Sequence, residues 1–256
     1  MKFIHTISKG SRHNQIYIPK EMEMNFSVGD IVQVKLVSKK IRLIYSKPLR
    51  NLSEFKEKLV LDVFSFLSQF QIKQIFFVGS FLTEKIDYND IDLLIIIKNQ
   101  DKNLEEIIYN KLIEKFNLKF HILVISDKRF NVLIKICPLI RSMLTFFVSD
   151  NNFKLEKNMY LDKNHIKFLL MMPEDILEIT PESRIFYDSL RRLVTIERFL
   201  NESDISTIRI NSDLEELLGS NLIIILKENA KIDSKTINRL RNIIKDKLAK
   251  INSKLK

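Results

Sequence analysis

The 256-residue chain has little of the residues that form disulfides, flexible linkers or membrane spans. Its single cysteine, Cys137, excludes an internal disulfide and a cysteine-rich zinc site, so we expect an ordinary buried thiol. Only four glycines and five prolines argue against long flexible linkers. No uncharged run approaches the roughly 18 apolar residues of a membrane helix, and we find no secretory signal. These features predict a folded, cytoplasmic protein with no membrane partner.

Positive charge is concentrated near the N-terminus. The formal net charge is +10, and residues 1–47 hold nine Lys or Arg against three acids, whereas residues 48–150 are almost balanced. A basic block on a small folded unit is the usual electrostatic footprint for a polyanion. We therefore expect residues 1–47 to bind nucleic acid.

The N-terminal segment has the pattern of a small β unit. Two short strands flank a basic turn, and the apolar run 16–18 stops at Pro19, which removes a ladder donor. A turn or short helix follows, and after Gly29 and Asp30 the alternating Val32, Val34 and Leu36 predict another strand.

The order ISKGSRHNQIYIPKE and then VGDIVQVKLV resembles the AbrB/SpoVT swapped-hairpin DNA-binding domain over about residues 3–47. The resemblance implies a homodimer whose chains exchange hairpins, because so short a unit buries little apolar surface alone. It also implies that Lys9, Arg12 and His13 lie on the loop that faces DNA. The alternative for each of them is an ordinary solvated turn.

A second pattern begins at Ser53, a candidate N-cap for a helix that extends to about residue 70. A buried strand over residues 74–78 then ends in Gly79-Ser80, and Asp90-Ile91-Asp92 leads into another strand. Side chains at i and i+2 of a strand share a face, so Asp90 and Asp92 can bind one hard cation such as Mg²⁺. Gly79 and Ser80 would let phosphate oxygens approach the backbone.

The run FFVGSFLTEKIDYNDIDLLIII resembles the signature of the polymerase-beta-like nucleotidyltransferase superfamily, and the resemblance covers roughly residues 53–150. It implies an Mg²⁺-dependent transfer of NMP from an NTP, with Asp90 and Asp92 as catalytic metal ligands and Gly79 and Ser80 at the nucleotide. The structural alternative is less favourable, because two buried carboxylates without a cation are costly.

One feature of the superfamily is missing from this sequence. Its third carboxylate usually lies on the next core strand, but residues 118–125 offer only His121 among apolar residues. His121 could contact metal or phosphate, although we favour a core histidine, and Asp127 could reach inward from just beyond the strand. Catalytic competence is therefore uncertain from the sequence.

The C-terminal third has helical periodicity and a lysine-rich last segment, which suits either a solvated face or a nucleic-acid surface. Glu178 and Glu197 are the acids here that could replace a missing base, and a surface role is the simpler interpretation for both. We expect this part to select the acceptor, whose identity the sequence does not show.

The expected fold class is α+β. A small N-terminal swapped-hairpin β module (residues 1–47) precedes a nucleotidyltransferase α/β core with a mixed sheet (48–150) and a C-terminal helical domain (151–256). We expect a nucleotidyltransferase tethered to a DNA-binding module, with a regulatory or toxin–antitoxin role. The alternative is a transcriptional regulator whose nucleotidyltransferase fold is catalytically silent or only senses nucleotide.

Overall fold

The computed structural model describes residues 4–34, 41–49, 51–84, 88, 90–99, 101, 103–156, 158–179 and 181–255. The chain forms two compact units, residues 1–40 and residues 41–256. In the part that the structure describes, no helix combines the length and apolar character needed to cross a membrane.

The first unit is a minimal hairpin followed by a short helix. Strands β1 (Ser8–Lys9) and β2 (Asn14–Gln15) pair antiparallel, and the short 3₁₀ helix η1 spans Lys20–Asn25. This confirms two strands around a basic turn with a short helix after them. Two details of the prediction are wrong. Strand β2 ends at Gln15, so Pro19 does not terminate it, and residues 31–34 form no strand. Leu36 lies outside the described residues.

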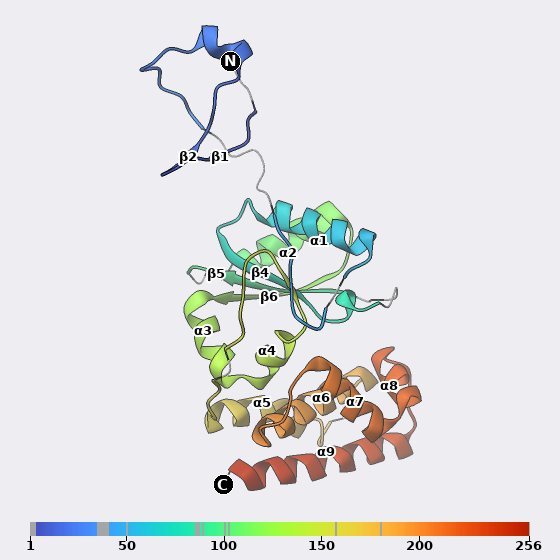
Figure 1. Cartoon of the computed structure of the whole chain (residues 1–256). Coiled ribbons are helices and arrows are strands. Elements are labelled where there is room, and N and C mark those ends of the chain that lie inside the picture. The colour runs from blue at the N-terminus through green and yellow to red at the C-terminus, as the bar shows by residue number, and fades with distance from the viewer. Residues whose placement is uncertain are drawn as a thin grey trace. The chain divides into compact units, whose positions relative to one another are not determined.

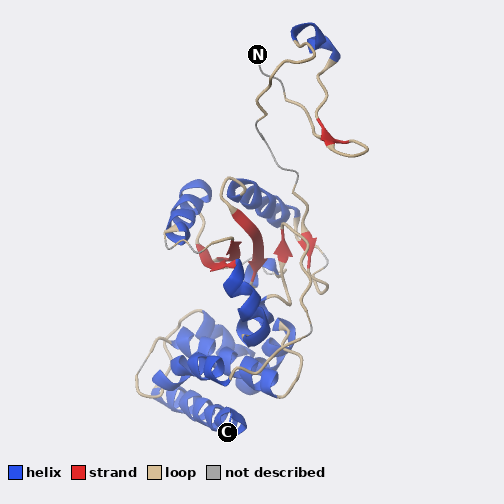
Figure 2. Cartoon of the chain, turned by 90° about the vertical axis from the view of Figure 1, so that its left-hand side faces the viewer, coloured by secondary structure: helices blue, strands red, loops and turns tan. Residues whose placement is uncertain are grey.

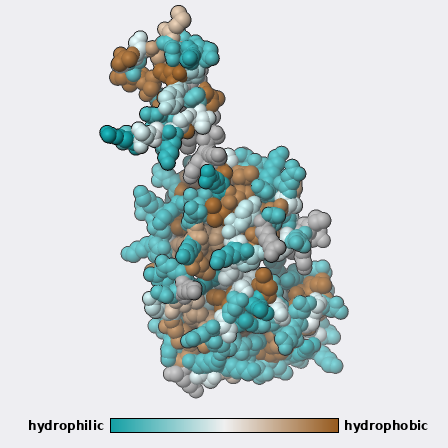
Figure 3. All heavy atoms as spheres, in the orientation of Figure 1, coloured by the Kyte–Doolittle hydropathy of each residue, from teal (hydrophilic) through white to brown (hydrophobic). Residues whose placement is uncertain are grey.

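Residues 31–34 form no strand because the described residues of this unit, 4–34, form no core. None of residues 4–34 is buried, and hydrophobic side chains lie on its surface (Figure 3). Those that are large and exposed are Ile4, Ile7, Ile16, Tyr17, Ile18, Met24, Val28, Ile31, Val32 and Val34. A strand needs both a hydrogen-bonding neighbour and a face to bury, and residues 4–34 provide neither for residues 31–34. The exchange of hairpins between two chains remains a prediction.

The second unit is built on a mixed sheet (Figures 1 and 2). It has five strands in the order β3-β7-β4-β5-β6. Its strands are β3 (Ile44–Tyr45), β4 (Ile72–Val78), β5 (Ile91–Ile97), β6 (Phe120–Ser126) and β7 (Val148–Ser149). Strands β5 and β6 are parallel, while the other pairs are antiparallel. The predicted mixed sheet is confirmed.

One face of the sheet is covered by α1 (Glu54–Leu67) and α2 (Leu104–Phe116). Helix α1 begins where predicted, and the Ser53 hydroxyl accepts a hydrogen bond from the Lys56 amide at 3.5 Å. Successive side chains of a strand point to opposite faces of the sheet. Phe77, Leu93 and Ile95 of the central strands pack against α1 and α2, and their neighbours along the strands point to the opposite face.

The remaining helices lie on the opposite side of the sheet, where α3 contacts β5 and β6 and the others pack mainly on one another. The remaining helices are α3 (Asp127–Ile136), α4 (Pro138–Met143), α5 (Lys163–Asp175), α6 (Ser183–Leu200), α7 (Thr207–Leu218), α8 (Ser220–Lys227) and α9 (Ser234–Leu255). Phe76, Leu94 and Ile96 of the sheet share one core with Phe186 and Leu190 of α6. Cys137 is buried in this core.

Two domain boundaries therefore differ from the expected ones. Residues 41–47 belong to the second unit, because β3 hydrogen-bonds to β7 of the sheet. Residues 151–256 are helical as expected, but they share a hydrophobic core with the sheet and lie in the same compact unit.

Candidate active site

The two aspartates lie where β5 begins, on the sheet face that packs against the C-terminal helices. Asp92 has the parity of Leu94 and Ile96, whose side chains enter the core shared with α6. Asp90 precedes the strand by one residue. The side chain of Asp90 is 16% exposed and that of Asp92 is 25% exposed, so both carboxylates are partly withdrawn from water. The structure thus places both acids at one end of the sheet, beside a helix distant in sequence.

Gly79 allows Asp92 to occupy this position. Val78 is paired with Asp92 across β4 and β5, and the next residue, Gly79, has φ 81° and ψ −161°. That backbone region is essentially restricted to glycine. A Cβ at Gly79 would lie 2.1 Å from Asp92 Oδ2, so the missing side chain leaves the space that the carboxylate fills. Ser80 follows, is exposed, and begins the 3₁₀ turn η2 (Ser80–Leu82).

A buried lysine fixes the segment after this turn. Lys56 of α1 is 6% exposed, and its Nζ donates to the Thr83 carbonyl at 2.7 Å. The same ammonium lies 5.3 Å from the ring centroid of Phe81 and 5.4 Å from that of Tyr88. Burial lowers the pKa of Lys56, while the carbonyl and the two rings contact its charged form. Lys56 therefore links α1 to the chain that connects Gly79 with the aspartates.

His121 occupies the strand position beside Asp92. The two residues are in register between β5 and β6, and His121 Nδ1 lies 3.0 Å from Asp92 Oδ1. The imidazole side chain is 76% exposed. The interpretation of His121 as a core residue is therefore wrong, because β6 is an edge strand and this part of its face is open to solvent.

The environment of Asp92 disfavours its ionised form. Burial is the main cause that raises the pKa of Asp92, and the nearby charge of Asp90 adds to it. The hydrogen bond from His121 and the charge of Arg191 oppose the increase. A bound cation therefore stabilises the ionised form of this partly buried carboxylate more than that of a fully hydrated one.

The other acids considered from the sequence lie away from Asp90 and Asp92. Asp127 forms an ion pair with Lys73 at 2.7 Å, and Glu197 forms one with Lys247 at 2.5 Å. Glu178 lies in the exposed turn after α5. The structure does not bring these three carboxylates to Asp90 and Asp92.

Helix α6 instead brings charged residues that the sequence did not single out. Arg184 Nη2 lies 3.9 Å from Asp90 Oδ2. Asp188, one turn later, is close enough for the charge of Asp90 to act on it, and the charge of Arg191 acts on Asp92. Spacings of four and then three residues put these side chains on one stripe of the helix. The spacing in the sequence is enough to predict that these residues share one side of a helix. That this side lies beside the start of β5 follows only from the fold.

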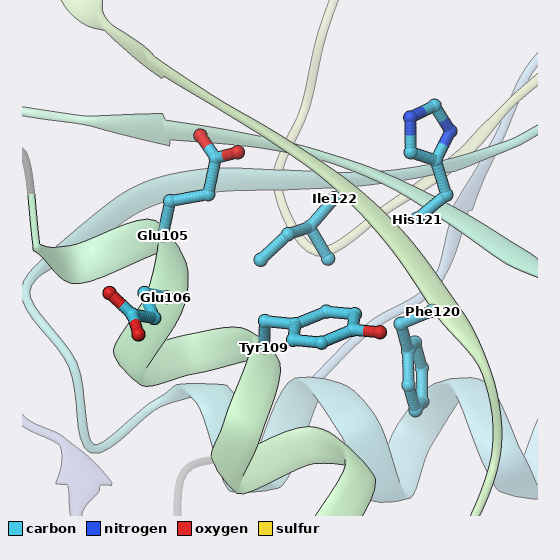
Figure 4. A pocket seen from close by; sticks show the side chains of 6 residues that line it. All are labelled: Glu105, Glu106, Tyr109, Phe120, His121 and Ile122. Carbon is cyan, nitrogen blue, oxygen red and sulfur yellow. The ribbon is translucent and has the colours of Figure 1, made fainter.

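A pocket lies on the other side of the edge strand. It is lined by Glu105, Glu106, Tyr109, Phe120, His121 and Ile122 (Figure 4). Phe120 and Ile122 belong to the sheet face covered by α1 and α2, and His121 points to the opposite side of the β6 ribbon. The aspartates are not among the lining residues, but His121, whose Nδ1 lies 3.0 Å from Asp92 Oδ1, is shared between this pocket and the acid cluster.

The N-terminal candidates lie together on the hairpin of the first unit. Lys9 belongs to β1, and Arg12 and His13 belong to the turn, where the Gly10 amide donates to the His13 carbonyl at 3.0 Å. All three basic side chains are exposed. Their contact with DNA remains a prediction.

Comparison with known proteins gives a family match within the second unit. No protein of curated function matches the sequence. The crystal structure of spectinomycin adenyltransferase AAD(9) from Enterococcus faecialis with ATP and spectinomycin is similar at 10% identity. The match covers 77% of this chain and 100% of that chain, with a TM-score of 0.47. Residues 57–146, which include both aspartates and the Gly79-Ser80 turn, match the family model of the nucleotidyltransferase domain.

Proposed function

We propose that this chain is a Mg²⁺-dependent nucleotidyltransferase that moves NMP from an NTP to an acceptor. The observation that carries the proposal is the fit between Gly79 and Asp92 within the matched nucleotidyltransferase domain. A glycine-only backbone and a partly buried carboxylate occupy one small space at the end of β4 and β5. Such a turn lets a phosphate approach the backbone directly beside a cation ligand.

Asp90 and Asp92 are the residues that would hold Mg²⁺. Their donors are hard carboxylate oxygens, which Mg²⁺ prefers. Both carboxylates are partly buried, so a bound cation would stabilise their ionised forms. Among the described residues, no group of three His, Cys, Asp or Glu could hold a metal ion. Triphosphate oxygens and water would complete the shell, as is usual for Mg²⁺. When bound, the ion would neutralise charge on the phosphates during transfer.

The residues of the chain supply position and electrostatics around that ion. His121 fixes one oxygen of Asp92, leaving the other oxygen toward Gly79. Lys56 fixes the segment that follows Ser80, so the amides of this turn keep their place relative to Asp92. Arg184 lies beside Asp90 and is 45% exposed, so its guanidinium can also meet an anionic substrate.

The N-terminal unit would tether this activity to DNA. Its basic excess and the exposed Lys9, Arg12 and His13 support binding to phosphates, and its exposed apolar side chains support pairing with a second copy. The full protein would then be a cytoplasmic homodimer with a regulatory or toxin–antitoxin role.

A second function is favoured by one observation. His121 stands beside Asp92 on the strand where the superfamily usually carries its third carboxylate. A site with two acids can bind Mg²⁺ and NTP without transferring NMP. The chain would then be a transcriptional regulator that senses nucleotide.

The release of pyrophosphate separates the two functions. The full chain is incubated with Mg²⁺ and each of the four NTPs, with water and glycerol as hydroxyl acceptors, and pyrophosphate and NMP products are measured. The enzyme proposal expects release that EDTA abolishes. Binding of Mg²⁺ and NTP without release would favour the sensor, and absence of both would contradict both functions.

A further inference from the structure

Helix α6 is the central helix of the C-terminal part and also reaches the acid cluster. It packs against α4, α5, α7, α8 and α9 (Figure 1). Its buried residues, including Phe186, Leu190 and Leu193, lie in the common core. Arg184 and Asp188 remain exposed. A helix fixed by packing on most of its surface can hold these polar side chains in a defined place.

Asp188 is the carboxylate that this helix adds to the acid cluster. Arg184, one turn before it on the same side of α6, lies 3.9 Å from Asp90, and the charge of Asp90 acts on Asp188. Asp127 and Glu197, by contrast, are paired with lysines. The charges of three arginines act on Asp188: Arg184 and Arg191 on its own stripe, and Arg192. Arg192 also donates to the Leu169 carbonyl at 3.2 Å. Asp188 is thus within electrostatic reach of Asp90 and of these three cations.

The position of Asp188 suits a group that receives a proton better than a group that binds metal. The described residues contain no group of three potential metal ligands, so Asp188 does not complete a cation site with Asp90 and Asp92. Burial raises the pKa of Asp188, which makes its carboxylate a stronger base, while the arginines oppose the increase and favour ionisation. Asp188 is only partly buried, and its exposed part leaves room for an acceptor to approach.

We propose that Asp188 is the general base that removes the proton from an acceptor hydroxyl, in place of the carboxylate missing from β6. This inference rests on the proposed nucleotidyl transfer. The acceptor oxygen forms a bond to the α-phosphorus of the NTP as the bond from that phosphorus to the pyrophosphate oxygen breaks. The hydroxyl proton passes to Asp188, and pyrophosphate leaves. The acceptor class is therefore an alcohol, bound between the start of β5 and the Arg184–Arg191 stripe.

The test compares Asp188→Asn with the wild-type full chain. Pyrophosphate release is measured with Mg²⁺ and each NTP, with water and glycerol as acceptors, and Mg²⁺-NTP binding is measured by thermal shift. Loss of a general base lowers turnover by about 10²-fold or more. The thermal shift from Mg²⁺ and NTP should persist, because Asp188 is not a ligand to the metal.

A chemical rescue separates proton transfer from a structural effect. Asp188→Ala leaves space for formate, and added formate should restore part of its turnover, which a purely structural loss would not allow. The matched control is Glu197→Gln, which also removes one carboxylate from α6. Glu197 lies about two and a half turns further along, on the opposite side of the helix, so its variant should keep wild-type turnover.

The outcomes distinguish this inference from the proposed function. If wild type turns over and Asp188→Asn stays within about threefold of it, the inference is overturned while nucleotidyl transfer stands. Failure of formate to restore Asp188→Ala also overturns the base role. Wild type that binds Mg²⁺ and NTP without release is a sensor, and wild type that does neither contradicts the proposed function. The inference falls in both of these cases.

Discussion

Replacing Gly79 with alanine tests the fit that positions Asp92. The glycine has φ 81° and ψ −161°, a region that costs other residues about 1–3 kcal/mol. In a unit of this size that strain lowers the melting temperature by about 2–12 °C. The new Cβ would also lie 2.1 Å from Asp92 Oδ2, where real Cβ contacts essentially never fall below 3.0 Å. The carboxylate must therefore move by about 0.9 Å, and displacements near 1 Å can reduce turnover about 10²-fold.

Gly219→Ala is the matched control for backbone strain. Gly219 has φ 80° and ψ 147°, and a Cβ there would meet nothing within 4 Å. Both variants should unfold at lower temperature in a thermal melt. Only Gly79→Ala should also lose the increase in melting temperature that Mg²⁺ and NTP produce. A Gly79→Ala protein that binds Mg²⁺ and NTP as tightly as Gly219→Ala would refute the reasoning.

Three further changes test separate parts of the molecule. In DNA binding, Lys9→Ala or Arg12→Ala should each lower the slope of log K against log salt by about one unit, and unchanged slopes would remove the hairpin from the DNA interface. Deleting residues 1–40, which leaves β3 in its sheet, should give a monomer by light scattering, and a truncated dimer would place the interface elsewhere. Without metal, Asp92→Asn should melt at a higher temperature than wild type at neutral pH, because burial raises the pKa of Asp92 and disfavours the ionised carboxylate. This gain should disappear as the pH falls through the raised folded-state pKa to below 3.8, where both folded and unfolded chains carry the proton; a gain that persists there has another cause.

The sequence predicted those features that local pattern determines. Ser53 before an apolar helical repeat located the start of α1. The i and i+2 spacing located Asp90 and Asp92 at the start of β5, although only Asp92 lies within the strand. Gly79 at the end of a buried strand predicted that phosphate oxygens could approach the backbone, which stays a prediction; the structure shows that the Asp92 carboxylate occupies the space where a Gly79 side chain would lie. Periodicity therefore located the strand ends that carry the nucleotidyltransferase signature.

The rest of the site depends on contacts between distant segments. His121 looked like a core residue because its neighbours are apolar, but β6 is an edge strand, a fact that strand order determines. Asp188 lies about 100 residues after the acids, and only the packing of α6 on the sheet relates them. Residues 31–34 alternate like a strand, yet a strand also requires a partner, and residues 4–34 offer none to this segment.

The most direct test of the central claim is the melting temperature of the wild-type full chain with Mg²⁺ and each NTP. A ligand at about 100 times its Kd that binds only the folded state adds about 2.7 kcal/mol, which corresponds to an increase of about 5–11 °C for a unit of this size. The Mg²⁺-dependent part should vanish in Asp92→Asn, because that variant keeps the side-chain volume and loses the charge. We predict an increase with at least one NTP that requires both Mg²⁺ and Asp92. No increase with any of the four NTPs would contradict both the enzyme and the sensor, and an equal increase in Asp92→Asn would show that nucleotide binds elsewhere.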